Sequence, residues 1–245
     1  MLEELFIKSR DFININNQKY KRYFIKSQKL EHRLSIIIGS RGVGKTTTVA
    51  QYISENYNDN EALYINLDDI ENTSKYTMMQ IAEEFVLNGG KLLCFDEIHK
   101  YEKWSAELKN IYDRFDKLKI IATGSSALQI NKGSHDLSRR AIIYTMVGMS
   151  FREFLELHYG YIFKPIELEE LLSNHIDIAT KIKGKIEQKD QKIIPLFKEY
   201  LKHGYYPYFI SMPNEVLFFQ TLQQNINVSI ESDLLHIYPK MSGNS

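Results

Sequence analysis

A chain of 245 residues, 43% of them hydrophobic, is long enough for one α/β domain and a smaller helical lobe around a shared core. Its 31 basic residues equal its 31 acidic ones, which excludes the bulk positive charge that drives non-specific binding to nucleic acid. The single cysteine excludes an internal disulfide framework, and neither a signal-peptide pattern nor a membrane-length apolar run is present, so we expect a cytoplasmic chain.

Apolar runs rich in β-prone residues punctuate the first part of the chain. They are residues 34–38, 62–67, 91–95, 119–122 and 141–147. Runs that are apolar at nearly every position suit strands buried on both faces, and the segments between them are long enough for helices. We therefore predict an α/β domain over residues 1–149, with a parallel five-stranded sheet and flanking helices.

After residue 149 the pattern changes to helical spacing with charged faces. Ser150 and Glu153 have the spacing of a capping box, in which each side chain satisfies a free amide at the start of a helix. Residues 181–192 are mostly polar and fit an exposed linker or a solvated helix end. We predict that residues 150–245 form a helical lid lobe and the start of a C-terminal region.

The segment after the first predicted strand fits the phosphate-binding pattern G-x-x-x-x-G-K-[ST]. Backbone N–H groups of such a loop point at the β- and γ-phosphates, and the positive end of the following helix faces the same place. Lys45 would add a cation and Thr46 a magnesium ligand, neither of which a simple glycine-rich turn needs. The residues predicted to hold ATP are Gly39, Ser40, Arg41, Gly42, Val43, Gly44, Lys45, Thr46 and Thr47.

Two acidic residues, Asp96 and Glu97, follow the third predicted strand. In an open parallel sheet the ligand lies beyond the carboxyl ends of the strands, so Asp96 would emerge beside the loop and help to hold Mg²⁺. Glu97 would then be placed to deprotonate an attacking water as general base. The alternative is a solvated loop start, but together with the loop the acidic pair predicts ATP hydrolysis.

The fourth predicted strand ends in hydroxyl-bearing residues, among them Thr123 and Ser125. Their hydroxyls can reach the phosphates, where they would respond to the γ-phosphate and help to position the water. An ordinary turn that closes the strand is the alternative.

Several other conspicuous residues favour packing over chemistry. His99 and Trp104 are expected to pack the next helix against the sheet, and Cys94 to be a buried, unreactive thiol. The basic and aromatic residues of 18–33 would suit a nucleic-acid backbone or a partner surface. The aromatic residues at 20, 23 and 24 follow helical spacing, however, which favours a helix with one packed and one solvated face.

These motifs, in their order and spacing, resemble the AAA+ ATPases. They are most similar to the bacterial and archaeal subfamily called AAA domain family fourteen, which is allied to the STAND signalling ATPases. The segments that carry the resemblance are GSRGVGKTTTV (39–49), CFDEIHKYEKWSAELKNIYD (94–113), IIATGSSALQI (120–130), LSRRAIIYTMVGMSFREFLEL (137–157) and HGYYPYF (203–209).

The resemblance implies ATP and Mg²⁺ as cofactors and leaves homo-oligomer formation open. Family members generally continue into a winged-helix segment, and because this sequence stops at Ser245 we expect either a truncated chain or an unusually short member. We expect a DNA or protein partner to be bound through that further region. The family pattern has Gly-Arg before the last strand and a proline shortly after it, and here Arg139 and Gly148 stand in place of the glycine and the proline.

Arg140 matches the family arginine, which often contacts the γ-phosphate in cis or from a neighbouring subunit. Because Arg140 precedes its strand, whereas phosphates lie at the carboxyl ends, we expect it to act in trans, with a surface charge pair as the alternative. Pro207 belongs to a segment similar to the family's Gly-Gly-aromatic-Pro, with Tyr205 at the second glycine. The resemblance implies that Pro207 touches the nucleotide, and an interhelical turn is the alternative.

Three functions share this set of motifs. The first is an ATP-hydrolysing switch or motor that acts on a partner or DNA, and the second is a nucleotide-gated protein-binding module with little or no turnover. A small-molecule kinase is the third, but nothing after residue 122 resembles an arginine-rich lid over an acceptor pocket. The sequence favours the first.

Overall fold

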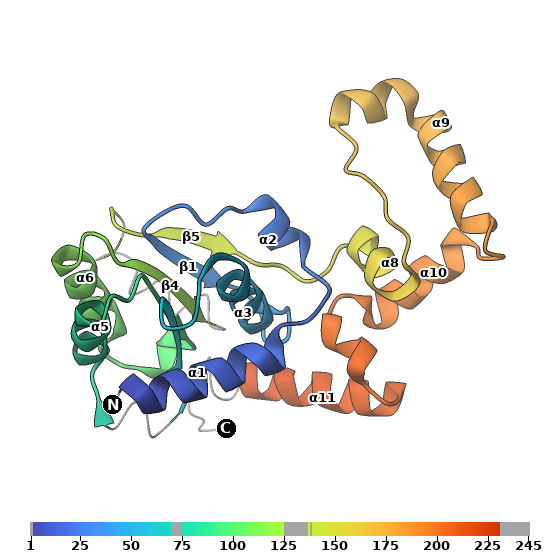
Figure 1. Ribbon diagram of the computed structural model, residues 1–245. Coiled ribbons are helices and arrows are strands. Elements are labelled where there is room, and N and C mark those ends of the chain that lie inside the picture. The colour runs from blue at the N-terminus through green and yellow to red at the C-terminus, as the bar shows by residue number, and fades with distance from the viewer. Residues whose placement is uncertain (1, 70–74, 125–136, 138, 231–245) are drawn as a thin grey trace, which may run out of the picture. The chain divides into compact units, whose positions relative to one another are not determined.

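The computed structural model describes residues 2–69, 75–124, 137 and 139–230 (Figure 1). Contacts divide the chain into two compact units. Of the described residues, those up to Val147 and from Leu222 to Ile230 form the first unit, and Gly148–Thr221 form the second. The predicted domain boundary after residue 149 lies close to this division, but assignment of residues 150–245 to one functional lobe stays a prediction.

A parallel five-stranded sheet forms the centre of the first unit, in the order β2-β3-β4-β1-β5. Its strands are β1 (Leu34–Ile38), β2 (Ala62–Asn66), β3 (Leu92–Asp96), β4 (Lys119–Gly124) and β5 (Ile142–Thr145). Strands β1 to β4 are almost wholly buried, whereas edge strand β5 leaves Ile142 42% exposed. The predicted α/β fold with five parallel strands is confirmed.

Helices cover both faces of this sheet. They are α1 (Leu2–Asn16), α2 (Tyr23–Ser27), α3 (Lys45–Asn56), α5 (Met78–Leu87) and α6 (Trp104–Arg114). Helix α3 connects β1 to β2 and so crosses the sheet toward the β2 edge, whereas α5 (β2 to β3) and α6 (β3 to β4) lead back in the opposite direction. Because such crossovers are right-handed, α3 lies on one face of the sheet and α5 and α6 on the other. Accordingly α1 packs against α3 and β2, and α5 packs against α6 (Figure 1).

The expected helix over residues 18–33 is wrong in extent, because α2 covers only Tyr23–Ser27. A side chain of α3 explains the difference. The Nε2 amide of Gln51 donates to the carbonyl oxygens of Gln18 at 2.6 Å and Tyr20 at 2.7 Å. Since these carbonyls are satisfied from α3, this stretch can cross the domain without forming a helix.

The second unit is helical. It comprises α8 (Phe151–Tyr159), α9 (Leu168–Glu187), α10 (Ile193–Glu199), a π-helical turn at Tyr200–Gly204, a 3₁₀ helix at Pro207–Ser211 and the first part of α11 (Glu215–Val228). The predicted capping box is confirmed, since the Ser150 hydroxyl accepts from the Glu153 N–H and the Glu153 carboxylate accepts from the Ser150 N–H. Among the helices described, none has the length and apolar character needed to cross a membrane.

Candidate functional site

The loop between β1 and α3 is shaped by its glycines. Gly42 and Gly44 have φ angles of 80° and 98°, in the left-handed region that glycine adopts at little cost. Gly39 serves a different purpose, since a β-carbon there would lie 2.2 Å from the backbone oxygen of Met146 at the end of β5. The loop can therefore curl tightly at the carboxyl end of β1 while its first residue packs against the neighbouring strand.

Lys45, the first residue of α3, is only 5% exposed. Its ammonium group donates to the carbonyl oxygens of Gly39 at 2.8 Å and Ser40 at 3.0 Å, and so lies within the loop. A buried cation at the positive end of a helix is unfavourable by itself, because the helix dipole repels it. The combined positive potential of Lys45 and the helix end is relieved by an anion, which makes the loop suited to phosphate.

The carboxylate of Asp96, at the end of β3, is 3% exposed and lies beside this loop. The Thr46 hydroxyl donates to its Oδ2 at 2.9 Å. Its other donors are the hydroxyls of Tyr64 and Thr123 and the backbone N–H of Glu97. Loop and acid, distant in sequence, are thus in direct contact, as the parallel-sheet argument predicts.

The oxygen atoms of Thr46 and Asp96 are of the kind that Mg²⁺ prefers, and they already lie together. Mg²⁺ is usually held by one or two carboxylates with phosphate oxygens and waters, so a dedicated protein cage is not needed. Across the described parts of the chain, no group of three or more His, Cys, Asp or Glu side chains is placed to hold a metal. The residues present therefore fit Mg²⁺ as a companion of a bound phosphate.

Glu97 has an unusual backbone, with φ 52° and ψ 43°. This left-handed conformation costs a residue with a side chain on the order of 1 kcal/mol and is found most often at functional sites. The Glu97 carboxylate lies 3.5 Å from Nδ1 of His99, which is buried. His99 and Trp104 are both buried, as expected, but the contact of His99 with the predicted general base was not foreseen.

Thr123 is buried at the end of β4, and its hydroxyl donates to Oδ1 of Asp96. This residue therefore contacts the acid that is predicted to hold the metal, and its contact with a phosphate stays a prediction. Ser125 lies outside the described residues, so its proposed role also stays a prediction.

Arg140 lies before β5, at the opposite end of the sheet from the loop, as predicted. Its guanidinium group pairs with Asp113 of α6 through Nε at 2.7 Å and through Nη2 at 2.9 Å. Pro207 begins the 3₁₀ helix of the second unit. The trans role of Arg140 and the nucleotide contact of Pro207 both stay predictions.

Tyr64 of β2 is a site residue that the sequence did not reveal. Its hydroxyl donates to Oδ2 of Asp96 at 2.5 Å, and its ring stacks on Phe12 of α1 with centroids 3.6 Å apart. Burial, with the adjacent carboxylate, raises the pKa of Tyr64, so the phenol stays protonated and remains a donor. Tyr64 pairs in register with Cys94, which places its side chain on the sheet face of Asp96, two residues further on.

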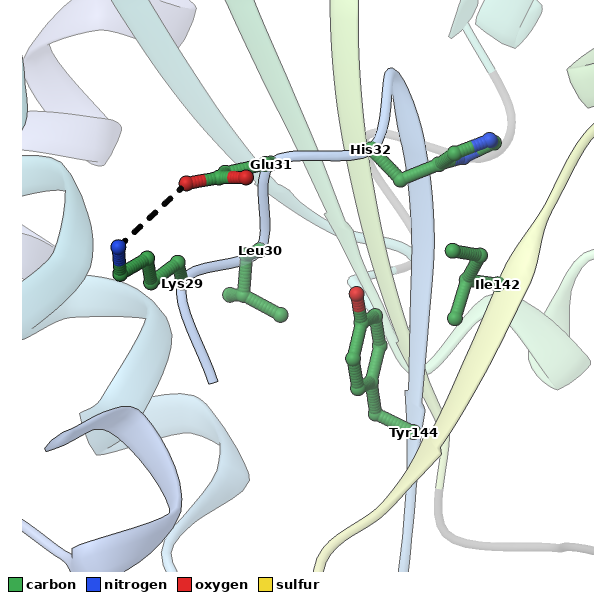
Figure 2. Close-up of a pocket in the computed structure, with 6 residues that line it drawn as sticks. All are labelled: Lys29, Leu30, Glu31, His32, Ile142 and Tyr144. Carbon is green, nitrogen blue, oxygen red and sulfur yellow. Dashed lines mark ion pairs between the residues drawn. The ribbon is translucent and has the colours of Figure 1, made fainter. Parts of the chain in front are cut away.

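A hollow of about 390 Å³ lies elsewhere, beside the amino ends of β1 and β5 (Figure 2). Its lining residues are Lys29, Leu30, Glu31, His32, Ile142 and Tyr144. The Lys29 and Glu31 side chains are 4.0 Å apart and both largely exposed. Because the phosphate loop lies at the carboxyl end of β1, this hollow is not part of the nucleotide site.

Together, the parallel sheet, the glycine-rich loop after β1 and the acid at the end of β3 define an α/β protein of the P-loop ATPase fold. A profile described as AAA domain matches residues 31–155, just over half of the chain, and the chain belongs to this family. The resemblance seen in the sequence is confirmed.

One relative is the uncharacterized protein MJ1637 of Methanocaldococcus jannaschii, which is 33% identical over 210 residues. The match covers 82% of this chain but only 43% of the relative, so the chain spans less than half of the length of that protein.

Two solved structures are also similar. The Walker-type ATPase PABY2304 of Pyrococcus abyssi has a TM-score of 0.49 at 12% identity, over 89% of this chain and 74% of that chain. The Hsp104–ADP complex of Saccharomyces cerevisiae has a TM-score of 0.38 at 19% identity, over 64% of this chain and 25% of that chain.

Proposed function

We propose that this chain binds ATP with Mg²⁺ at the loop of residues 39–47 and hydrolyses it, as a switch or motor that acts on a partner. The observation that carries the proposal is the 2.9 Å hydrogen bond between Thr46 and Asp96, beside the buried ammonium group of Lys45. It supports the proposal because the ammonium group proposed to bind phosphate and the two proposed magnesium ligands lie together near the carboxyl ends of β1 and β3.

Each side chain has a defined task in this proposal. The loop N–H groups and Lys45 bind the β- and γ-phosphates, and Lys45 exchanges its bonds to the Gly39 and Ser40 carbonyls for phosphate oxygens. Thr46 and Asp96 would hold Mg²⁺, which would neutralise charge on the phosphates.

Glu97 acts as general base. It accepts a proton from a water molecule whose oxygen attacks the γ-phosphorus, as the bond to the leaving ADP oxygen breaks. Thr123 holds the Asp96 carboxylate through its hydroxyl, and so supports the orientation of a metal ligand.

The contact between Glu97 and His99 supports a second candidate function. With its carboxylate 3.5 Å from the buried His99 ring, Glu97 has a protein partner that competes with a water for it. If this contact persists with ATP bound, the chain would be a nucleotide-gated binding module with little turnover.

Single-turnover hydrolysis of ATP with Glu97→Gln separates the two functions. For a hydrolase we expect the rate to fall at least about a hundredfold while ATP affinity is kept, because a general base contributes about that factor or more. Glu102→Gln, which changes an exposed acid close by in sequence, is the matched control and should keep the wild-type rate. A wild-type chain that binds ATP without turnover would favour the gated module, and a Glu97→Gln rate near wild type would place the base elsewhere.

The partner is also a proposal. Because the acidic and basic residues of the chain balance, a DNA contact would need a local basic surface. Measuring ATP turnover with and without DNA distinguishes a DNA partner from a protein partner. Turnover that rises with single- or double-stranded DNA supports a DNA-acting motor, whereas an unchanged rate favours a protein partner.

A further inference from the structure

Arg22, between α1 and β1, is a buried charged residue at 5% exposure that the proposed reaction does not use. Its guanidinium group joins two segments far apart in sequence. One Nη donates to the carbonyl oxygen of Val43 in the phosphate loop, and the other donates to the carbonyl oxygen of Val147 at 2.9 Å. Val147 is the residue after which the chain passes into the second unit.

The bond to Val43 fixes the direction of a loop peptide. In a trans peptide the C=O and the N–H of the next residue point to opposite sides. Because the Val43 carbonyl points to Arg22, the Gly44 N–H points away from Arg22, as required of a donor that faces a phosphate. Rotation of this peptide changes φ of Gly44, and glycine tolerates either sign of φ, so the loop glycines alone do not hold the peptide in place.

The segment that follows β5 and leads out of the first unit is held close to the beginning of the same loop. The Met146 N–H donates to the Ile38 carbonyl at 2.7 Å, and the backbone of Gly39 approaches the Met146 carbonyl too closely for a β-carbon. Met146 is therefore held beside the beginning of the loop by its bond to β1. Val147 is held by Arg22, which also bonds to the middle of the loop.

We propose that Arg22 is a positioning residue that ties the orientation of the Gly44 N–H to the Val147 carbonyl, and so couples nucleotide binding to the start of the second unit. This inference rests on the proposed function, since it requires a phosphate in the loop. Movement of the Val43 peptide on binding would strain or relax the bond to Val147 through one rigid, planar guanidinium group.

Arg33 provides a matched comparison within the same unit. It also donates to two backbone carbonyls, those of Asp116 at 2.8 Å and Tyr112 at 2.9 Å, and it also precedes β1. Neither carbonyl belongs to the phosphate loop or to the exit strand. Removal of Arg33 therefore measures how much the loss of two such hydrogen bonds affects the protein through folding stability, with the phosphate loop and the exit strand untouched.

The test measures ATP·Mg affinity by calorimetry, together with amide hydrogen exchange of residues 145–150 with and without ATP·Mg, in Arg22→Gln, Arg22→Lys and Arg33→Gln. We expect Arg22→Gln to weaken ATP binding at least about tenfold, since it removes charge-assisted hydrogen bonds, and to abolish the nucleotide-dependent change in exchange. Arg22→Lys should keep part of the affinity but lose the exchange response, because a single compact ammonium group cannot span two carbonyls on separate segments as the two Nη atoms of a guanidinium do. Arg33→Gln should keep both.

The outcomes separate this inference from the proposed function. Wild-type affinity and exchange in Arg22→Lys, or an equal loss of affinity in the Arg22→Gln and Arg33→Gln variants, would overturn the coupling role while leaving ATP binding in place. Failure of the wild-type chain to bind ATP·Mg would overturn the proposed function and the inference with it. If Arg22→Gln does not fold, the Arg22→Lys measurements decide the question.

Discussion

The ring of Tyr205 lies against Gly148, so closely that a β-carbon at Gly148 would be 2.3 Å from two of its ring carbons. By the resemblance drawn from the sequence, Gly148 stands at the position of a proline and Tyr205 at the position of a glycine. The backbone also joins them locally, since the Met149 N–H donates to the Tyr205 carbonyl at 2.8 Å. The absence of a side chain at Gly148 thus leaves the space that the Tyr205 ring occupies.

Substitution of Gly148 by alanine should therefore be costly only while Tyr205 is present. We expect Gly148→Ala to lower the free energy of unfolding by about 1 kcal/mol, the low end for overpacking, because the partly exposed Tyr205 ring can move toward solvent. In a Tyr205→Ala background the same substitution should cost almost nothing. Chemical denaturation of the wild type, the two single variants and the double variant gives the coupling energy between the two positions. If the losses in unfolding free energy simply add, the contact is contradicted.

Loss of the Tyr64 hydroxyl should alter the magnesium requirement. Tyr64→Phe removes a donor to Asp96 Oδ2, so we expect ATP binding to need about tenfold more Mg²⁺, in line with loss of a group that orients a metal ligand. Tyr52→Phe is the control, because the Tyr52 hydroxyl bonds to the Lys119 ammonium at 2.6 Å and not to the acid. Magnesium titrations of ATP binding check this, and superimposable curves for Tyr64→Phe and wild type would refute it.

The sequence was sufficient for the features that local patterns determine. Mostly apolar runs located the five strands to within a few residues, because strands β1 to β4 are buried on both faces and leave little room for polar residues, while the β-prone residues of the run 141–147 marked the more exposed edge strand β5. The spacing of Ser150 and Glu153 located the start of α8 for an equally local reason. The contact of Thr46 with Asp96 also followed, since the carboxyl ends of parallel strands meet at one edge.

The residues that the sequence missed are those whose partners depend on sheet order. Tyr64 reaches Asp96 only because β2 lies next to β3 in register, and this order was not predicted. Arg22 appeared as one of many basic residues in a polar stretch, and its two carbonyl partners lie 21 and 125 residues away. The short extent of α2 was missed for a similar reason. Helix propensity within residues 18–33 does not reveal that the Gln51 side chain bonds to two backbone carbonyls of this stretch.

Arg140 has a structural partner in Asp113, and the bond holds the Asp113 pKa below its usual value. If Arg140 also completes the site of a neighbouring subunit, mixtures of Arg140→Ala and Lys45→Ala chains should regain part of the ATPase rate, because each lacks a different half of a composite site. The Asp113→Asn variant by itself should keep the wild-type ATPase rate. No recovery in mixtures that mass measurement shows to co-assemble would leave Arg140 with the ion pair alone.

The central claim is that the loop around Lys45 binds the phosphates of ATP. Calorimetric titration of ATP·Mg into the wild-type chain and into Lys45→Ala tests it most directly, with Lys91→Ala, which changes an exposed lysine paired with Glu61, as the control. We predict tight binding by wild type and control, and affinity at least about a hundredfold weaker for Lys45→Ala, because the phosphates lose a charge-assisted donor in a buried site. An affinity unchanged by Lys45→Ala would contradict the account.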